Sequence, residues 1–392
     1  MPALAWVAVG ILTPILVALL VWLTAPRSTN RVYLQTGIPS RMLRRYRMLW
    51  QRGAATVAGW PHLVDVALGT RRVATGTAPA EVVWDEGRAT LRRYDGPRTH
   101  PEPVLVVHAL VTWPWILDLT EERSLIRRLV AEGLDVYLLD WGHPAAEDAG
   151  RDLEDHALTL MRAEQEVLAI SGAERVHLVG YCLGGTLCLA RAAAWPDPFL
   201  GSLVMIASPI DTDVRGGIGG VLRRRALRPV LALDQRSMVP PSLVRESFHL
   251  LRRRAIETVL GRIVSRVEDR EAKDAYAALA RWVWEHRPLP GALFLDIVDL
   301  FRENALWHGE LRFEGERRAE LSRVAAPMLL VIADRDHIVP AASSMRLTER
   351  DLAAPIEVLA SPGGHVSTLM GRWGREVVWP GMAAWLADRQ AG

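Results

Sequence analysis

One stretch, residues 176–186, constrains the fold of this 392-residue chain more than any other. It is an apolar run followed by the turn Gly-Tyr-Cys-Leu-Gly-Gly, and a helix-forming run follows it to Ala194. A strand that bends sharply into a helix, with a nucleophilic side chain at the bend, is a nucleophile elbow. The stretch therefore predicts an elbow with Cys182 as the nucleophile. The alternative is a glycine-rich strand-to-helix turn around a buried cysteine.

The glycines of this stretch have a physical reason. A sharp turn brings backbone segments into contact, so we expect Gly180 and Gly184 to be positions where a Cβ does not fit. The Cys182 thiol and the amide of Leu183 then face the same point above the sheet edge. The second cysteine, Cys188, lies six positions further on and faces another side of the helix, so no disulfide between the two is expected.

Predicted strands and helices alternate along most of the chain. The expected strands lie at residues 81–85, 89–94, 104–108, 135–140, 176–179, 202–207, 327–333 and 356–360. The expected helices lie at residues 121–132, 153–170, 187–194, 341–350 and 377–389. The first two strands read as a β-hairpin. The rest of the alternation predicts right-handed βαβ crossovers and a mostly parallel sheet covered by helices on both faces.

The alternation stops between residues 209 and 323, a segment rich in arginine and aromatic residues. It is too long for a structureless connection, so we expect a mostly helical cap inserted between two core strands. The predicted division is a transmembrane anchor (1–26), a basic amphipathic and linker segment (27–80), the first part of the core (81–211), the cap (212–323) and the second part of the core (324–392).

The N-terminus differs from the rest of the chain. Residues 4–25 carry no charge, and ~20 apolar residues span a bilayer. The arginines that follow, without an acid among them, are Arg27, Arg31, Arg41, Arg44, Arg45, Arg47 and Arg52. The positive-inside rule then predicts an N-terminal transmembrane helix with the body of the protein in the cytoplasm. Residues 40–52 are expected to form a basic amphipathic helix on the membrane lipid. The alternatives are an uncleaved signal segment and a buried hydrophobic helix.

An acid and a histidine follow the last two predicted strands. Asp336 comes shortly after the strand at 327–333, with Asp334 as the competing choice, and His365 follows the strand at 356–360. Nucleophile, acid and histidine in this chain order are the arrangement of the α/β-hydrolase triad. We therefore expect an α/β-hydrolase fold with a catalytic triad of Cys182, Asp336 and His365.

The sequence resembles the polyhydroxyalkanoate synthases, and most closely their class III catalytic subunit, over roughly residues 75–390. The motifs that carry the resemblance lie at residues 109–111, 116–119, 124–125, 133–142, 180–185, 336–340, 363–365 and 379–380. The resemblance implies that Cys182, Asp336 and His365 are the catalytic residues. His108, Trp113 and the N-terminal span depart from the family pattern.

The implied reaction polymerises (R)-3-hydroxyacyl-CoA into polyester with release of CoA. Attack of a Cys182 thiolate on the CoA thioester keeps the acyl group activated, while His365 moves the proton and Asp336 orients the imidazole. We expect the amides of Leu183 and Val111 to hold the oxyanion. Acyl-CoA is the substrate, and no cofactor or metal is expected. The expected partners are membrane lipid and a second synthase subunit or a second copy of the chain. Association of the protein with polyester granules is compatible with its expected location at the membrane. The net charge of +2 argues against nucleic acid.

Two other functions stay open. One is a membrane-anchored thioesterase or ester hydrolase that uses Cys182 and gives the acyl group to water. The other is a non-catalytic module that binds granules or lipids through its arginine-rich N-terminus. The clusters at residues 223–225 and 252–254 are candidates for binding CoA phosphates, or else solvated helix faces.

Overall fold

The computed structural model describes residues 73–223, 234–245 and 270–390. The predicted anchor, most of the segment at 27–80 and the arginines at 252–254 lie outside these residues. No helix within the described ranges has both the length and the hydropathy needed to cross a bilayer. The chain divides into two compact units, Val73–Arg253 with Arg281–Gly392, and Met1–Arg72 with Arg254–Ala280. Within the second unit, the described residues belong to the first part of helix α10 (Arg270–Trp284).

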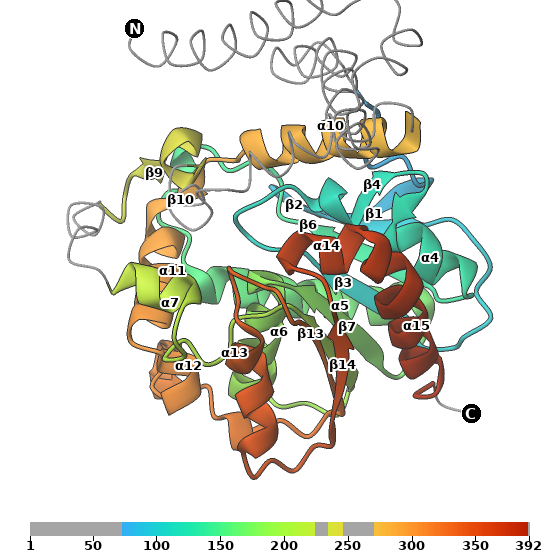
Figure 1. Ribbon diagram of the computed structural model, residues 1–392. Coiled ribbons are helices and arrows are strands. Elements are labelled where there is room, and N and C mark those ends of the chain that lie inside the picture. Colours follow the sequence, from blue (N-terminus) through green and yellow to red (C-terminus); the bar gives the residue numbers. More distant parts are fainter. Residues whose placement is uncertain (1–72, 224–233, 246–269, 391–392) are drawn as a thin grey trace, which may run out of the picture. The chain divides into compact units, whose positions relative to one another are not determined.

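The first unit is built on an eight-stranded sheet in the order β1-β2-β6-β3-β7-β8-β13-β14 (Figure 1). Its strands are β1 (Ala80–Glu86), β2 (Ala89–Tyr94), β3 (Val104–Val107), β6 (Val136–Asp140), β7 (Val176–Tyr181), β8 (Leu200–Ile206), β13 (Met328–Ala333) and β14 (Ile356–Ser361). The six strands from β6 to β14 run parallel, whereas β1 and β2 form an antiparallel hairpin at one edge. The predicted mostly parallel sheet and its edge hairpin are therefore confirmed.

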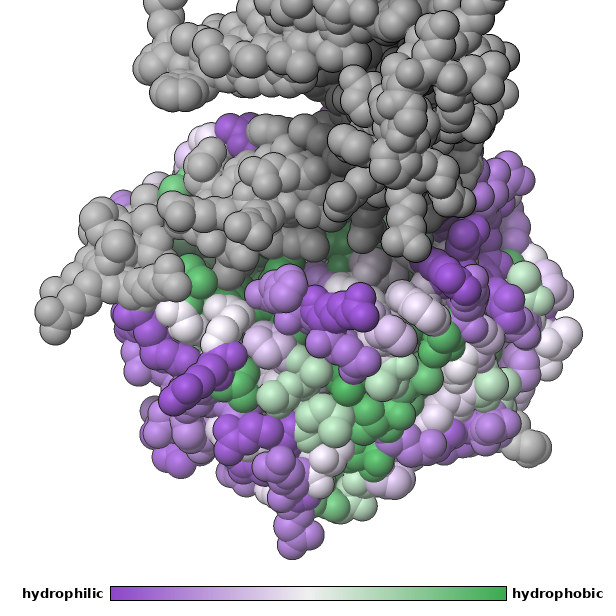
Figure 2. All heavy atoms as spheres, in the orientation of Figure 1, coloured by the Kyte–Doolittle hydropathy of each residue, from purple (hydrophilic) through white to green (hydrophobic). Residues whose placement is uncertain are grey.

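Burial explains the strand sequences. The strands β3, β6, β7, β8 and β13 are buried along their whole length. Such strands are covered on both faces, so their sequences are continuous apolar runs in which polar and apolar residues do not alternate. The outer strand β14 is partly exposed, and Val358 at its centre is 39% exposed. Figure 2 shows apolar residues gathered over this region, with hydrophilic residues around them.

Helices cover the sheet in two groups (Figure 1). In one group α5 (Leu153–Ser171) packs against α6 (Leu183–Ala194), and in the other α4 (Leu125–Ala131) packs against α15 (Trp379–Ala387). The short helices α13 (Ala341–Met345) and α14 (His365–Met370) follow β13 and β14. The parallel strands and the crossover helices between them place the carboxyl ends of β3, β6, β7, β13 and β14 at one edge of the sheet, where ligands bind in such folds.

The predicted helix at residues 121–132 begins four residues too early. The structure instead has a small antiparallel pair there, β4 (Asp118–Thr120) with β5 (Arg123–Ser124). The Ser124 side chain then accepts a hydrogen bond from the amide of Arg127, which starts α4 at Leu125. A serine in this cap position satisfies an amide that the first helical turn leaves unpaired. The predicted helix at 341–350 is likewise α-helical only to Met345 and continues as a 3₁₀ turn.

The described part of the cap mixes helices with two-residue strands. Its helices and strands are α7 (Gly217–Leu222), β9 (Met238–Val239), α10 (Arg270–Trp284), β10 (Leu289–Pro290), α11 (Gly291–Arg302), α12 (Ala305–His308), β11 (Arg312–Phe313) and β12 (Arg317–Arg318), with 3₁₀ turns at Glu314–Glu316 and Leu321–Arg323. The expectation of a mostly helical segment omitted the strand pairs β9–β10 and β11–β12. Two-residue strands leave no periodicity in a sequence, which is why the pattern missed them.

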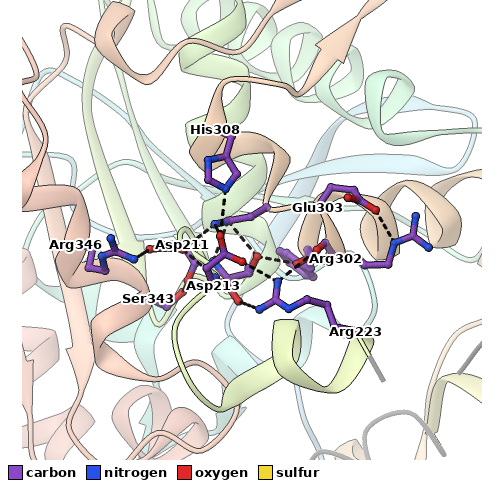
Figure 3. Close-up of polar contacts among 11 residues, drawn as sticks. Asp211, Asp213, Arg223, Arg302, Glu303, His308, Ser343 and Arg346 are labelled. Atoms are coloured by element: carbon purple, nitrogen blue, oxygen red, sulfur yellow. Dashed lines mark hydrogen bonds and ion pairs between the residues drawn. The ribbon is translucent and has the colours of Figure 1, made fainter. Parts of the chain in front are cut away.

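A polar network centred on Asp211 joins the cap to the core (Figure 3). The fully buried Asp211 accepts hydrogen bonds from Asn304 Nδ2 at 2.7 Å and from the Asp213 amide at 2.9 Å, and it pairs with Arg346. Ser343 Oγ donates to the Asp211 carbonyl at 2.6 Å. The segment after β8, the start of α12 and helix α13 are thus held together at one carboxylate.

Replacing Asp211 by alanine is expected to destabilise the fold by about 2 kcal/mol, because the buried amide of Asn304 loses one of its two carboxylate acceptors and the Asp213 amide loses its acceptor. Urea unfolding measures this difference. Asp213→Ala is the matched comparison: that carboxylate is about half exposed, its ion pairs contribute under ~1 kcal/mol, and it accepts the longer of the two Asn304 hydrogen bonds, at 3.0 Å. Equal losses in the two variants would contradict the central position given to Asp211.

Candidate active site

Cys182 stands at the bend between β7 and α6, as predicted. Its backbone has φ 53° and ψ −124°, a left-handed conformation that is strained for a residue with a side chain. The Cys182 amide donates to the Ile206 carbonyl at 2.8 Å, and the amide of Gly185 donates to the Cys182 carbonyl at 3.0 Å. These bonds hold the bend from both sides.

The two glycines of the elbow are required by contact, as the sequence predicted. A Cβ on Gly180 would overlap the backbone of Gly185, and one on Gly184 would overlap the carbonyl oxygens of Val107 and His108. The first contact closes the bend on itself. The second brings the chain leaving β3 against the first turn of α6, so two segments distant in sequence meet beside Cys182.

The acid and the histidine meet at the same edge of the sheet. His365 Nδ1 lies 2.7 Å from Asp336 Oδ2, and both side chains are buried. Asp336 Oδ1 accepts hydrogen bonds from the amides of Ile338 (2.8 Å) and Val339 (2.9 Å), which fix the carboxylate. Asp334, the competing choice, is exposed. The structure therefore brings Asp336 to His365.

Cys182 also contacts His365, and this contact affects the charge of the imidazole. Burial lowers the pKa of His365, but electrostatic interactions with Asp336 and Cys182, and hydrogen bonds between the imidazole and both side chains, raise the pKa to about 10. The ring of Tyr181 lies against the imidazole, with 5.4 Å between ring centroids. The surroundings of His365 thus favour the protonated form of its imidazole.

This charge balance predicts the titration of His365. Because Asp336 and Cys182 both favour the cation, removing either one lowers its pKa, so in Cys182→Ala and in Asp336→Asn we expect the ring to lose its proton at lower pH than in the unmodified chain. NMR of histidine-labelled protein, followed from pH 6 to 10.5, measures both shifts. A His365 pKa that stays the same in Cys182→Ala would contradict the Cys182 contact.

The two predicted oxyanion donors flank the elbow. Leu183 is the first residue of α6. Val111 lies in a turn at residues 109–112, which follows β3 and is closed by a hydrogen bond from the Thr112 amide to the Ala109 carbonyl (3.2 Å). The packing of Gly184 against the end of β3 brings this 109–112 turn to the elbow. The roles of Leu183 and Val111 remain predictions.

Other predicted groups lie away from the triad. Cys188 is buried inside α6, and neither cysteine forms a disulfide. Of the first arginine cluster, Arg223 forms an ion pair with Asp213 in the network of Figure 3, while residues 224 and 225 lie outside the described ranges. Within the described ranges no three His, Cys, Asp or Glu side chains are grouped as metal ligands are.

The sequence did not single out a second set of side chains at this edge of the sheet. Arg287 contacts both Asp140, at the end of β6, and Trp113, in the segment that follows β3. The sequence offered one signal for this contact: Asp140 is a charged residue at the end of the otherwise apolar strand β6.

Comparison with known proteins agrees with the fold described above. The family model of the α/β hydrolase family matches residues 104–378. A crystal structure of Paleococcus ferrophilus monoacylglycerol lipase superposes with a TM-score of 0.50, covering 76% of this chain and 99% of the lipase at 21% identity. The class of the protein is therefore the α/β hydrolases, which catalyse reactions at an elbow of this kind.

Two curated relatives identify the family to which the chain belongs within the α/β hydrolases. The poly(3-hydroxyalkanoate) polymerase subunit PhaC of Synechocystis sp. is 30% identical over 329 residues, 81% of this chain and 86% of the relative. The PhaC of Allochromatium vinosum is 28% identical over 329 residues, covering 82% of this chain and 92% of the relative. The chain belongs to the PhaC family of poly(3-hydroxyalkanoate) polymerases.

Proposed function

We propose that this protein is a polyhydroxyalkanoate synthase that polymerises (R)-3-hydroxyacyl-CoA through an acyl-Cys182 intermediate. Membership of the PhaC family supports the substrate and the product. The contact of His365 with both Asp336 and Cys182 carries the catalytic assignment. A Cys-His-Asp triad at a strand-to-helix elbow is suited to acyl transfer, because the imidazole moves the proton and the carboxylate holds the ring.

The first step acylates the sulfur. The Cys182 thiolate, paired with the His365 imidazolium, attacks the thioester carbonyl of the acyl-CoA. The bond from the carbonyl carbon to the CoA sulfur breaks, and the leaving CoA thiolate takes the proton from His365. One thioester replaces another, so little free energy is lost and the acyl group stays activated.

The second step forms the ester. Neutral His365 takes the proton from the 3-hydroxyl of the next hydroxyacyl unit, and that oxygen attacks the acyl-Cys182 carbonyl. The carbon–sulfur bond breaks and restores the thiolate beside the imidazolium. Asp336 stabilises the cation each time it forms, and it is held for this by the amides of Ile338 and Val339.

Both steps pass through a tetrahedral intermediate with a negative oxygen. The amide of Leu183, at the start of α6, and the amide of Val111 are the proposed donors to this oxygen. Loss of one such donor costs ~10²–10³ in rate in related reactions. The first turn of α6 adds the positive end of the helix dipole.

The proposed location is the cytoplasmic face of the cell membrane, with association to polyester granules. The uncharged residues 4–25 and the arginines that follow them support an anchor in this orientation. A second synthase subunit or a second copy of the chain is the proposed protein partner.

The deciding experiment supplies the purified full-length chain with (R)-3-hydroxybutyryl-CoA. We expect CoA release, an acyl group on Cys182 detected by mass spectrometry, and insoluble polyester. Free 3-hydroxybutyrate in place of polyester would favour the thioesterase alternative. No acylation of Cys182 at all would reject both enzymes and leave the non-catalytic module.

A further inference from the structure

A buried arginine reaches from the cap to the edge of the sheet beside the elbow. Arg287 lies in the segment that leads into β10, and its side chain is only 3% exposed. Its Nη2 donates to Asp140 Oδ1 at 2.9 Å, at the end of β6, and its Nη1 donates to the Gly142 carbonyl. The guanidinium also lies over the ring of Trp113, 4.0 Å from the centroid. One side chain thus joins three segments.

Stability alone is a weak reason for this arrangement. Taking an arginine and a carboxylate out of water costs several kcal/mol for each ion, and the attraction between them often no more than offsets that cost. The Asp140 side chain is 11% exposed, so both charges are largely removed from water. In some proteins a buried pair of this kind instead fixes the arrangement of the segments that it joins.

The segment that Arg287 fixes is the one that carries Val111. Trp113 directly follows the 109–112 turn, so contacts that hold the ring and the backbone of Trp113 also fix the position of the end of that turn. The Trp113 carbonyl accepts a further hydrogen bond from Trp282 Nε1 at 3.0 Å, also from the cap side. Ring stacking on Arg287 and the backbone bond to Trp282 therefore hold Trp113 from two directions.

Apolar packing from the cap holds the same turn. Val239 of β9, Leu289 of β10 and Val244 form a small buried cluster, and Val111 packs against it. Arg287 stands two residues before Leu289, so its contacts with Asp140 and Gly142 anchor the β9–β10 pair to the core. The 109–112 turn lies between this cluster on one side and the elbow on the other.

We propose that Arg287 is a positioning residue for acyl transfer: by locking Trp113 and the β9–β10 pair to the end of β6, it holds the Val111 amide at the thioester oxygen. This inference rests on the proposed function. The cap would then position one of the two oxyanion donors, through the Arg287 side chain, which does not contact the reacting atoms.

The test uses the full-length chain and two rates. Iodoacetamide alkylation of Cys182 needs the nucleophile but no oxyanion donor, whereas acylation by (R)-3-hydroxybutyryl-CoA in a single turnover needs both. In Arg287→Met we expect acylation to fall ~10²-fold, since a small misplacement of a catalytic group has this effect, while alkylation changes less than about 2-fold. The acylation rate is expected to fall by a similar factor in Arg287→Lys, because an ammonium lacks the planar guanidinium that binds Asp140 and stacks on Trp113.

Arg92 offers a matched control. It is 46% exposed, and its Nη2 lies 3.7 Å from Oδ2 of the same Asp140. Arg92→Met removes one positive charge near the carboxylate and leaves the contacts with Trp113 and Gly142, so both rates should stay within about 3-fold of the unmodified chain. Arg287→Met with Asp140→Asn removes both charges of the buried pair, which restores folding if Arg287→Met alone is unstable. Acylation in this double variant should still be slow.

The outcomes separate the two proposals. Acylation at the unmodified rate in Arg287→Met or in the double variant overturns the positioning role, and so does an equal loss of alkylation and acylation. If the unmodified chain is alkylated at Cys182 but never acylated, the proposed function itself fails, and the role of Arg287 fails with it.

Discussion

Replacing Cys182 by alanine is expected to lower CoA release from (R)-3-hydroxybutyryl-CoA by roughly 10⁶-fold, as removal of the nucleophile does in related triads. The reason is that the acyl group loses its only proposed attachment site, so neither transfer nor hydrolysis through the enzyme can begin. A thiol-reactive dye follows CoA release, and mass spectrometry of the quenched reaction tests for the acyl group.

Cys188→Ala is the matched control for this experiment. The Cys188 thiol is fully buried in α6, and burial raises its pKa, so it is neutral and inaccessible. Its removal costs packing, and we expect CoA release within a few-fold of the unmodified chain. Retained turnover in Cys182→Ala, or its loss in Cys188→Ala alone, would show that the elbow cysteine is not the nucleophile.

Replacing Asp336 by asparagine is expected to lower turnover by ~10⁴-fold, because the imidazole loses both its orientation and the charge that stabilises its cation. An asparagine is close in size to the carboxyl group, so the fold should persist. The steady-state rate with (R)-3-hydroxybutyryl-CoA measures the effect.

Asp334→Asn provides the comparison within the same turn. Asp334 is exposed, and the hydrogen bond recorded for it joins its amide to the Ser361 carbonyl, a contact that the substitution leaves intact. We expect turnover within about 2-fold of the unmodified chain. A larger loss in Asp334→Asn than in Asp336→Asn would reverse the assignment of the acid.

Much of the core was predictable because its strands are buried along their whole length. Continuous apolar runs bounded by turn residues marked β3, β6, β7, β8 and β13 to within two residues at either end. The elbow was predictable for a different reason, since Gly180 and Gly184 occupy positions where no other residue fits. Both features leave a local signal in the sequence, although the contact that requires Gly184 is with Val107 and His108, which lie far away along the chain.

The choice between Asp334 and Asp336 depended on a turn that the sequence does not specify. In the structure, the amides of Ile338 and Val339 bond back to Asp336 Oδ1, and this leaves Oδ2 for His365. The role of Arg287 was equally hidden. Its partners Asp140 and Trp113 lie far away along the chain, and they meet it only because the cap folds back over the sheet edge.

The left-handed backbone at Cys182 has a consequence for how this family relates to ester-cleaving enzymes of the same fold. Main-chain hydrogen bonds and the absence of side chains at its glycines set the bend. The position of the side-chain atom at residue 182 therefore does not depend on whether that atom is sulfur or oxygen. In the proposed reaction, sulfur in place of oxygen keeps the acyl-enzyme near the energy of the incoming thioester.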